Sequence, residues 1–243
     1  MSQAFHLDNR VVLVTGATRG IGAATVRELL KFKVKKIYAG ARNPDGLPQF
    51  NDPRVVPLQL DITDPQSVTK ARAVAADVDV LINNAGTAVL SHFLDSSEEV
   101  LGADINTNYV GTLRVTRAFA PAIVAKGGGL IANVISVVGL TSAPSLSGYS
   151  ASKAALHSQT QALRTQLKAS NVQVLGIYPG PVETELARDI QAEKASPESV
   201  AQEIVAGIKA GETYIFPDQI AKHVGQLWAN DGRILDTALV REA

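Results

Sequence analysis

Two side chains able to move protons stand four residues apart in the segment Tyr149-Ser150-Ala151-Ser152-Lys153. On a helix, this spacing places both side chains on one face. A cation beside a phenol stabilises the phenolate, so we expect Lys153 to lower the pKa of Tyr149 from about 10 toward neutrality. A tyrosine tuned in this way is a general acid for reducing a carbonyl, or a general base for oxidising an alcohol. We therefore predict that Tyr149 and Lys153 are catalytic.

A serine hydroxyl precedes this pair, at the end of the apolar run that finishes with Ile135-Ser136. There, Ser136 is suited to hold a substrate oxygen beside the phenol; alternatively, it satisfies backbone groups at the end of a strand. A serine hydrolase is disfavoured, because no G-x-S-x-G segment surrounds Ser136 and no histidine stands in a triad-like context. His157 continues the Tyr149 face, and we interpret it as a packing or subunit-contact residue.

A glycine-rich segment with the spacing G-x-x-x-G-x-G follows the first apolar run, from Thr15 to Gly22. Glycines let the backbone approach a pyrophosphate closely, and the start of a following helix offers free N–H groups to phosphate. The alternative is a tight turn without a ligand. We predict that the phosphates of a dinucleotide are held by Gly16, Thr18, Arg19, Gly20, Ile21 and Gly22.

The residues at the end of the second apolar run indicate which dinucleotide is bound. An acidic residue at this point usually binds the ribose 2′-hydroxyl of NAD, but the sequence here is Ala39-Gly40-Ala41-Arg42, with no carboxylate before Asp45. Arg42 is a planar cation suited to phosphate, and Arg19 is the second candidate. Unless Arg42 is simply solvated, this favours NADP(H), bound beside Ala41 and Arg42.

Short β-branched runs alternate with longer helical patterns, which predicts parallel strands joined by helices. We expect a single-domain α/β protein built on a Rossmann-like, doubly wound parallel sheet, with ligands at the carboxyl ends of the strands. The predicted strands are Val11–Thr15, Lys36–Ala39, Val55–Gln59, Val78–Ile82, Leu130–Ile135, Val172–Ile177 and Thr213–Phe216. The predicted helices are Gly20–Phe32, Asp64–Ala76, Ser97–Ala125, Gly148–Ala169, Pro197–Ala210 and Gln219–Asn230.

Composition narrows the class of protein. The 243 residues carry 23 basic and 23 acidic side chains, so no charge excess points to nucleic acid. The absence of cysteine excludes disulfides and thiolate metal sites. No apolar run is long enough to span a membrane, and the first ten residues do not resemble a signal peptide. We expect a cytoplasmic protein that binds neither nucleic acid nor membrane.

Taken in chain order, these features resemble the short-chain dehydrogenase/reductase family over about Asp8 to Thr184, three quarters of the chain. Four further motifs complete the pattern: Asp61-Ile62, Asn83-Asn84-Ala85-Gly86, Asn108-x-x-Gly111 and Pro179-Gly180-Pro181-Val182-x-Thr184. Each motif is weak alone, whereas their joint occurrence in this order is highly specific.

The resemblance implies a role for each matching residue. Asn108 would position a water that links Lys153 to solvent, and Lys153 would also bind the nicotinamide ribose. Tyr149 is predicted to contact the cofactor as well, and no metal is needed because the tyrosine polarises the carbonyl. Asp61 and Ile62 would contact the adenine, and the adenosine side would lie against Asn84, Ala85 and Gly86. The nicotinamide would be held by Pro179, Gly180, Val182 and Thr184.

Three features limit what the resemblance implies. Many relatives end in a glycine-rich segment that supports a tetramer, whereas this chain ends in Asp218–Ala243, with Trp228 and a polar terminus. We expect a homo-oligomer, and this difference leaves open whether it is a dimer or a tetramer. The compact length disfavours the nucleotide-sugar epimerase branch. A cofactor-sensing regulator without turnover and a dehydratase or isomerase remain as alternatives to a carbonyl reductase or alcohol dehydrogenase.

Two segments are expected to line the substrate pocket. The segment Leu140–Gly148 offers Leu140, Ala143, Pro144 and Leu146, and the segment Glu183–Ile190 offers Leu186, Ala187 and Ile190. The charges in the second segment are mixed in sign. Together they predict a neutral, mainly apolar small-molecule carbonyl or alcohol as substrate.

Overall fold

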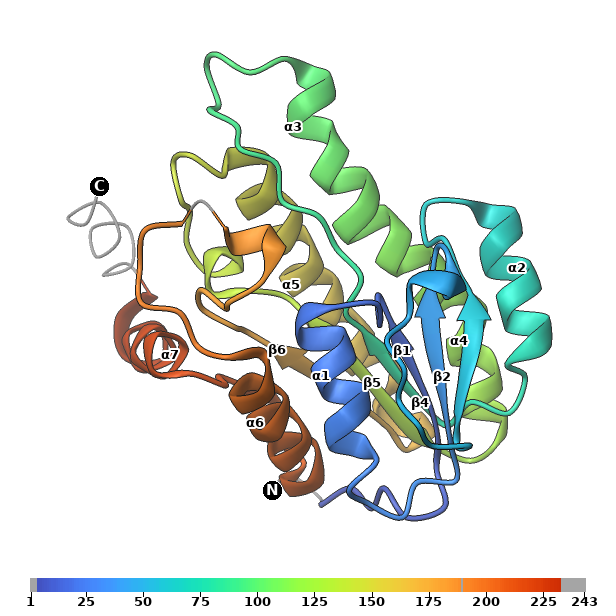
Figure 1. Ribbon diagram of the computed structural model, residues 1–243. Coiled ribbons are helices and arrows are strands. Elements are labelled where there is room, and N and C mark those ends of the chain that lie inside the picture. Colours follow the sequence, from blue (N-terminus) through green and yellow to red (C-terminus); the bar gives the residue numbers. More distant parts are fainter. Residues whose placement is uncertain (1–3, 189, 233–243) are drawn as a thin grey trace.

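A seven-stranded parallel sheet forms the centre of the molecule (Figure 1). The computed structural model describes residues 4–188 and 190–232. The strands follow the order β3-β2-β1-β4-β5-β6-β7, so the chain runs outward in both directions from the β1/β4 pair. Their bounds are β1 Val11–Thr15, β2 Lys36–Ala41, β3 Val55–Gln59, β4 Val80–Asn83, β5 Gly129–Val134, β6 Val172–Ile177 and β7 Tyr214–Ile215. The predicted doubly wound sheet is confirmed.

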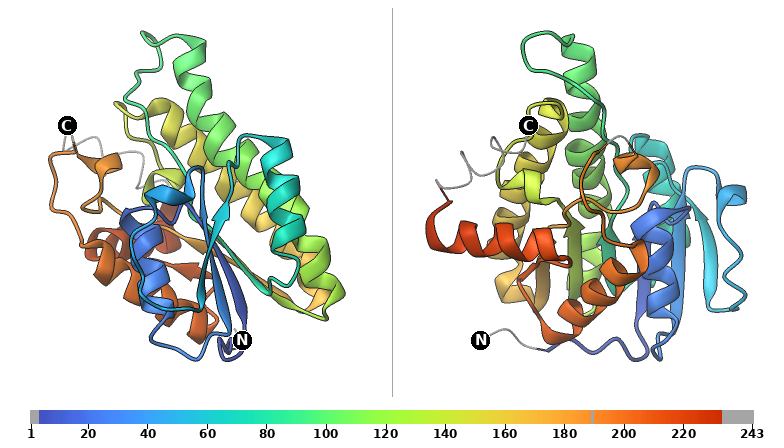
Figure 2. Two further views of the ribbon diagram at one scale, coloured as in Figure 1. Left: turned by 45° about the vertical axis from the view of Figure 1, so that its right-hand side comes forward. Right: turned by 60° about the vertical axis from the view of Figure 1, so that its left-hand side comes forward.

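Both faces of the sheet are covered, which explains why its central strands are apolar at successive positions. In β1, Val12 and Val14 pack into one hydrophobic layer, whereas Val11 and Leu13 pack into the opposite one. Helices α1 (Gly20–Leu29) and α6 (Pro197–Ala210) cover the first face. Helices α2 (Pro65–Val74) and α4 (Thr112–Ala125) pack on the second, and α5 (Ser147–Leu167) lies beside them (Figures 1 and 2).

Helix ends follow local capping chemistry. The side chain of Asp64 accepts a hydrogen bond from Gln66 N at the start of α2, and that of Ser196 accepts one from Ser199 N at the start of α6. A proline follows each cap, as is favoured at a first helical position. Asn171, at φ 53°, ends the turn after α5 in a left-handed conformation.

The long helix predicted over Ser97–Ala125 is not a regular α-helix. It consists of α3 (Glu98–Asp104), a π-helical turn at Ile105–Gly111, and α4. A π turn widens the helix and changes the direction of the side chains that follow, and such turns are frequent at functional sites. Here the turn carries Asn108, which is fully buried. Hydrophobic periodicity alone does not reveal an insertion of this kind.

The C-terminal helix α7 (Gln219–Asp231) is present, and its Trp228 packs against Tyr214. His157 also lies edge-on to Trp228, and its Nδ1 is 2.8 Å from the hydroxyl of Tyr178. The interpretation of His157 as a packing residue is therefore confirmed. The end of the predicted polar tail, residues 233–243, lies outside the described residues. No helix in the described ranges is long and apolar enough to cross a membrane.

Candidate active site

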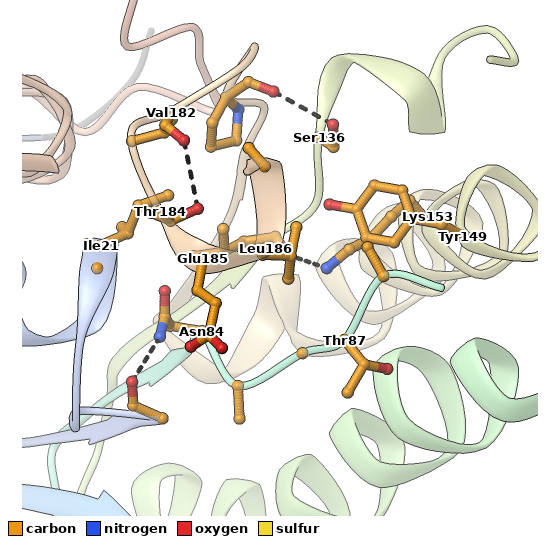
Figure 3. A pocket seen from close by; sticks show the side chains of 18 of the residues that line it. Ile21, Asn84, Thr87, Ser136, Tyr149, Lys153, Val182, Thr184, Glu185 and Leu186 are labelled. Atoms are coloured by element: carbon orange, nitrogen blue, oxygen red, sulfur yellow. Dashed lines mark hydrogen bonds between the residues drawn. The ribbon is translucent and has the colours of Figure 1, made fainter. Parts of the chain in front are cut away.

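A cavity of about 1260 Å³ opens at the carboxyl ends of the strands, beside the point where the strand order reverses. Ligands in doubly wound sheets bind at this position. Every residue predicted to be catalytic or to bind the cofactor, except Asn108, lines the cavity. Figure 3 shows side chains from several segments directed into it, among them Asn84, Tyr149, Lys153 and Glu185.

The glycine loop is shaped so that side chains are excluded. Gly16 and Gly20 have φ values of +67° and +54°, a region that favours glycine. A Cβ on Gly22 would lie 2.2 Å from the carbonyl oxygen of Gly16, so that position has no room for one. Asn84 fixes the loop to β4, because its Nδ2 donates to the carbonyl oxygens of Thr15 at 2.9 Å and Gly16 at 3.2 Å. Asn84 thus has a structural role in holding the glycine loop in place.

Helix α1 begins directly after this loop, at the cavity wall. No side chain caps its first turn, so its N–H groups and the positive end of its dipole are available to an anion. This uncapped helix start, the close-packed glycines and the cavity volume together fit the pyrophosphate of a dinucleotide. The residues present therefore fit a dinucleotide cofactor in shape and in charge.

The two predicted phosphate-binding cations are placed differently. Arg42 is exposed at the cavity rim, and its charge acts on Asp61. Burial opposes ionisation of Asp61, but hydrogen bonds from Thr63 and the charges of Arg42 and Arg114 outweigh it and lower the pKa of Asp61. Arg19 instead forms an ion pair with Glu185, which also lines the cavity. Arg42 is therefore the more available of the two.

Ser136 and Tyr149 meet at the inner end of the cavity. Ser136 follows β5, and its hydroxyl donates to the carbonyl oxygen of Pro179 at 3.2 Å. Tyr149 stands in the first turn of α5, at the cavity wall. Burial raises the pKa of Tyr149 to about 12, and a hydrogen bond with Ser136 opposes this rise. The two hydroxyls are thus positioned to bind one substrate oxygen together.

The prediction that Lys153 lowers the pKa of Tyr149 toward neutrality is wrong for this arrangement. Its Nζ lies 5.5 Å from the centre of the Tyr149 ring and donates to the carbonyl oxygen of Val134 at 2.9 Å. Burial dominates both groups, because it raises the pKa of Tyr149 and lowers that of Lys153 to about 8. The negative charge of Asp104 raises both pKa values.

Asn108 lies behind the cavity wall and holds it in place. Its Oδ1 accepts from Thr87 N at 2.8 Å, and its Nδ2 donates to Thr87 O at 2.9 Å and to Ser152 Oγ at 2.9 Å. Ser152 in turn donates to the carbonyl oxygen of Tyr149 at 2.6 Å. The contacts of Thr87, Ser152 and Asp104 were not foreseen from the sequence. One signal was available for Asp104, which precedes Asn108 by four residues on a predicted helix.

Another part of the cavity wall is mainly apolar. Both segments predicted to line it do so, through Ala143, Pro144, Leu146, Leu186, Ala187 and Ile190. Leu140 does not; it packs instead against the hydrophobic clusters around Ile135 and Ala221. The loop after β4 adds Ala88 and Leu90, which the motif search missed because this loop carries no chemical signature. Asp189, one of the predicted mixed charges, lies outside the described residues.

Comparisons with known proteins agree with this geometry. A model of the short chain dehydrogenase family matches residues 10–195. An NADP-dependent 3-hydroxy acid dehydrogenase of Schizosaccharomyces pombe is 31% identical over 240 residues, covering 88% of this chain and 93% of that protein.

Two solved structures extend the comparison. A short chain dehydrogenase from Burkholderia cenocepacia, solved in complex with NADP, superposes with a TM-score of 0.91 at 35% identity and covers 97% of this chain and 99% of its own. A Burkholderia phymatum enzyme in complex with NAD shares the fold, with a TM-score of 0.84 at 22% identity over 96% of this chain and 97% of its own. The family match covers every cavity-lining residue except Ile220. The chain therefore belongs to the short-chain dehydrogenase/reductase family of oxidoreductases.

Proposed function

We propose that this protein is an NADP(H)-dependent carbonyl reductase that acts on neutral, mainly apolar ketones or aldehydes and also catalyses the reverse oxidation of alcohols. The observation that carries the proposal is that Ser136, Tyr149 and Lys153 converge in one cavity, which the glycine loop also lines. The complex of the Burkholderia cenocepacia relative with NADP supports the cofactor assignment.

Each side chain has a defined task in this mechanism. Ser136 and Tyr149 bind the substrate carbonyl oxygen, and Tyr149 donates its hydroxyl proton to that oxygen. When bound, the reduced nicotinamide supplies the hydride. Lys153 returns a proton to Tyr149 and binds the nicotinamide ribose. Asn108 holds the wall at Thr87 through two hydrogen bonds, and we propose that it also positions the water that links Lys153 to solvent.

The protonation state of Tyr149 favours the direction of reduction. A phenol whose pKa is about 12 stays protonated at neutral pH, which is the form needed to donate a proton. Alcohol oxidation needs the phenolate, which is scarce under the same conditions. We therefore propose carbonyl reduction as the main activity near neutral pH.

The choice of cofactor gives a first test. The wild type should bind NADPH more tightly than NADH, and Arg42→Gln should weaken NADPH binding with little effect on NADH. A charge-assisted contact contributes about 1.5–3 kcal/mol, which corresponds to roughly 10- to 100-fold in Kd. Ala41→Asp should narrow or reverse the preference, because its carboxylate repels the 2′-phosphate and accepts the ribose hydroxyl. Fluorescence titration of the wild type and both variants with NADPH and with NADH measures the dissociation constants.

Lys33→Gln is the matched control for Arg42→Gln. Lys33 is exposed and does not line the cavity, so its substitution removes the same charge far from the cofactor. Its NADPH affinity should equal that of the wild type at matched ionic strength. A wild type that binds NADH more tightly than NADPH contradicts the cofactor assignment.

Substrate charge gives a second test. Glu185 lies beside the apolar residues Leu186 and Ala187 and is paired with Arg19 and Arg188. The cations of the described cavity wall that form no ion pair, Arg42 and Lys153, are those assigned above to the cofactor, so none is left over for a substrate carboxylate. We expect kcat/KM for neutral aryl and alkyl ketones to exceed that for 3-oxo acids of similar size by tenfold or more, at about 1.4 kcal/mol per factor of ten. The name of the Schizosaccharomyces pombe relative points to acid substrates, so clear preference for the acids would place this chain with that relative.

Turnover itself separates the remaining alternatives. Incubation with NADPH and a panel of ketones and aldehydes should reduce the absorbance of the reduced nicotinamide in step with alcohol formation. A cofactor-sensing regulator would bind NADPH without any such change. A dehydratase or isomerase would convert substrate while the absorbance stays constant.

A further inference from the structure

A buried carboxylate lies beside the catalytic pair and is not used by the mechanism above. Asp104 is the last residue of α3 and is 0% exposed. Its Oδ1 accepts a hydrogen bond from Thr87 Oγ1 at 2.7 Å, and its Oδ2 accepts one from Val89 N at 3.0 Å. Keeping a carboxylate away from water is costly unless hydrogen bonds or an opposite charge compensate.

Asp104 and Lys153 are both buried, and neither is in an ion pair within the described part of the chain. They approach the same segment from different sides. Thr87 binds Asp104, and the preceding residue Gly86 borders the ammonium, since a Cβ placed on Gly86 would lie 3.6 Å from Lys153 Nζ. Opposite charges interact strongly across such a poorly solvated region even without contact.

We propose that Asp104 is the buried counter-charge that keeps Lys153 protonated, and that it also fixes the cavity wall at Thr87 and Val89. It is a positioning residue, because it acts through Lys153 and the wall without touching substrate. Its part in turnover rests on the proposed function, whereas its effect on Lys153 does not. The direction of its influence on the pKa of Lys153, which is upward, agrees with the geometry.

Other titratable groups on α5 and the elements packed against it are placed differently. His92, Glu98 and Glu99 are exposed at or before the start of α3. Tyr109 on the π turn is half-buried, and Lys168 after the end of α5 is exposed. Farther along α5, His157 contacts Tyr178 and Arg164 contacts Tyr214. Asp104 is the acidic group whose charge acts on both Tyr149 and Lys153.

Asp104→Asn tests the charge with little change of shape. The asparagine Oδ1 still accepts from Val89 N, and its Nδ2 donates to the Thr87 hydroxyl once that hydroxyl rotates. Asp104→Glu keeps the charge, and Glu99→Gln is the matched control, because it removes an exposed carboxylate from the same helix.

The direct readout is acylation of Lys153 in the cofactor-free protein, followed by peptide mass spectrometry across a pH series. Only the neutral amine reacts, so the midpoint of labelling reports the pKa of the lysine. We expect the midpoint of Asp104→Asn at lower pH than that of the wild type, with Asp104→Glu and Glu99→Gln near the wild type. Equal midpoints in Asp104→Asn and the wild type would overturn the proposal.

Turnover supplies the second readout. In Asp104→Asn, the decline of kcat/KM for carbonyl reduction at high pH should begin at lower pH than in the wild type. A purely structural role would lower the rate equally at every pH. Because labelling needs no turnover, it tests Asp104 even if the chain reduces no carbonyl. Should Asp104→Asn fail to fold, the double variant Thr87→Val, Asp104→Leu removes the same charge together with its hydroxyl partner. A labelling midpoint at lower pH than in the wild type would then support the proposal, and an equal midpoint would overturn it.

Discussion

Replacing Tyr149 by phenylalanine is expected to lower kcat for carbonyl reduction by about 10²–10⁴-fold, the usual contribution of general acid catalysis. The substitution removes one hydroxyl and leaves the ring in place, so α5 and the cavity wall should keep their shape. NADPH binding should change little. Steady-state kinetics and cofactor titration of the purified variant check both expectations. A variant that retains most of its activity would remove Tyr149 from the mechanism.

The pH dependence of the wild type is the companion measurement. Because burial raises the pKa of Tyr149 to about 12, the phenolate needed for alcohol oxidation becomes more abundant as pH rises. Oxidation should therefore accelerate with pH across the neutral and mildly alkaline range. Reduction should decline above about pH 8, where Lys153 loses the proton that it returns to Tyr149. Ser136→Ala is the matched comparison: it should weaken reduction without removing this difference between the two directions.

Replacing Lys153 by methionine is expected to have two opposite effects. Turnover should fall by about 10²-fold or more, because the proton supply to Tyr149 is lost, and NADPH binding should also weaken. Stability should rise, because the native protein no longer buries an ammonium, whose burial cost in the wild type exceeds the attraction of Asp104. The pKa of Lys153 falls from 10.5 to about 8, which corresponds to a cost of about 3 kcal/mol at neutral pH. Loss of the hydrogen bond to Val134 offsets about 1 kcal/mol of this gain.

Chemical denaturation at two pH values tests whether Lys153→Met raises the free energy of unfolding. Between pH 8 and 10.5 the unfolded wild type binds more protons at this lysine than the native protein does, so its free energy of unfolding should rise with pH. Lys153→Met should lack this contribution and should be about 2 kcal/mol more stable than the wild type near pH 7. Measurements should stay below about pH 10, where Tyr149 begins to act in the opposite direction. A variant less stable than the wild type at pH 7 would contradict the burial cost assigned to Lys153.

Much of the fold and the candidate site was predictable because the relevant rules act over short distances in the chain. The i, i+4 spacing of Tyr149 and Lys153 places them on one helical face wherever that helix lies. Apolar strands that alternate with helices lead to a parallel sheet, and the carboxyl ends of parallel strands meet at one edge. The glycine loop, Ser136 and the Asn84 motif all follow such strand ends. Their convergence on one cavity therefore followed from the order of the elements.

Tertiary structure alone determined the pKa values and the long-range contacts inside the site. The upward shift of the Tyr149 pKa arises from burial, which depends on everything packed around α5. The ion pair of Arg19 with Glu185 and the approach of Asp104 to the region of Lys153 join segments far apart in the chain. No spacing rule predicts such contacts, because they depend on how loops cross the cavity mouth and on the π turn that directs Asn108. Local sequence thus determined which groups reach the cavity, whereas packing determined their charge state, since solvent exclusion belongs to the folded molecule as a whole.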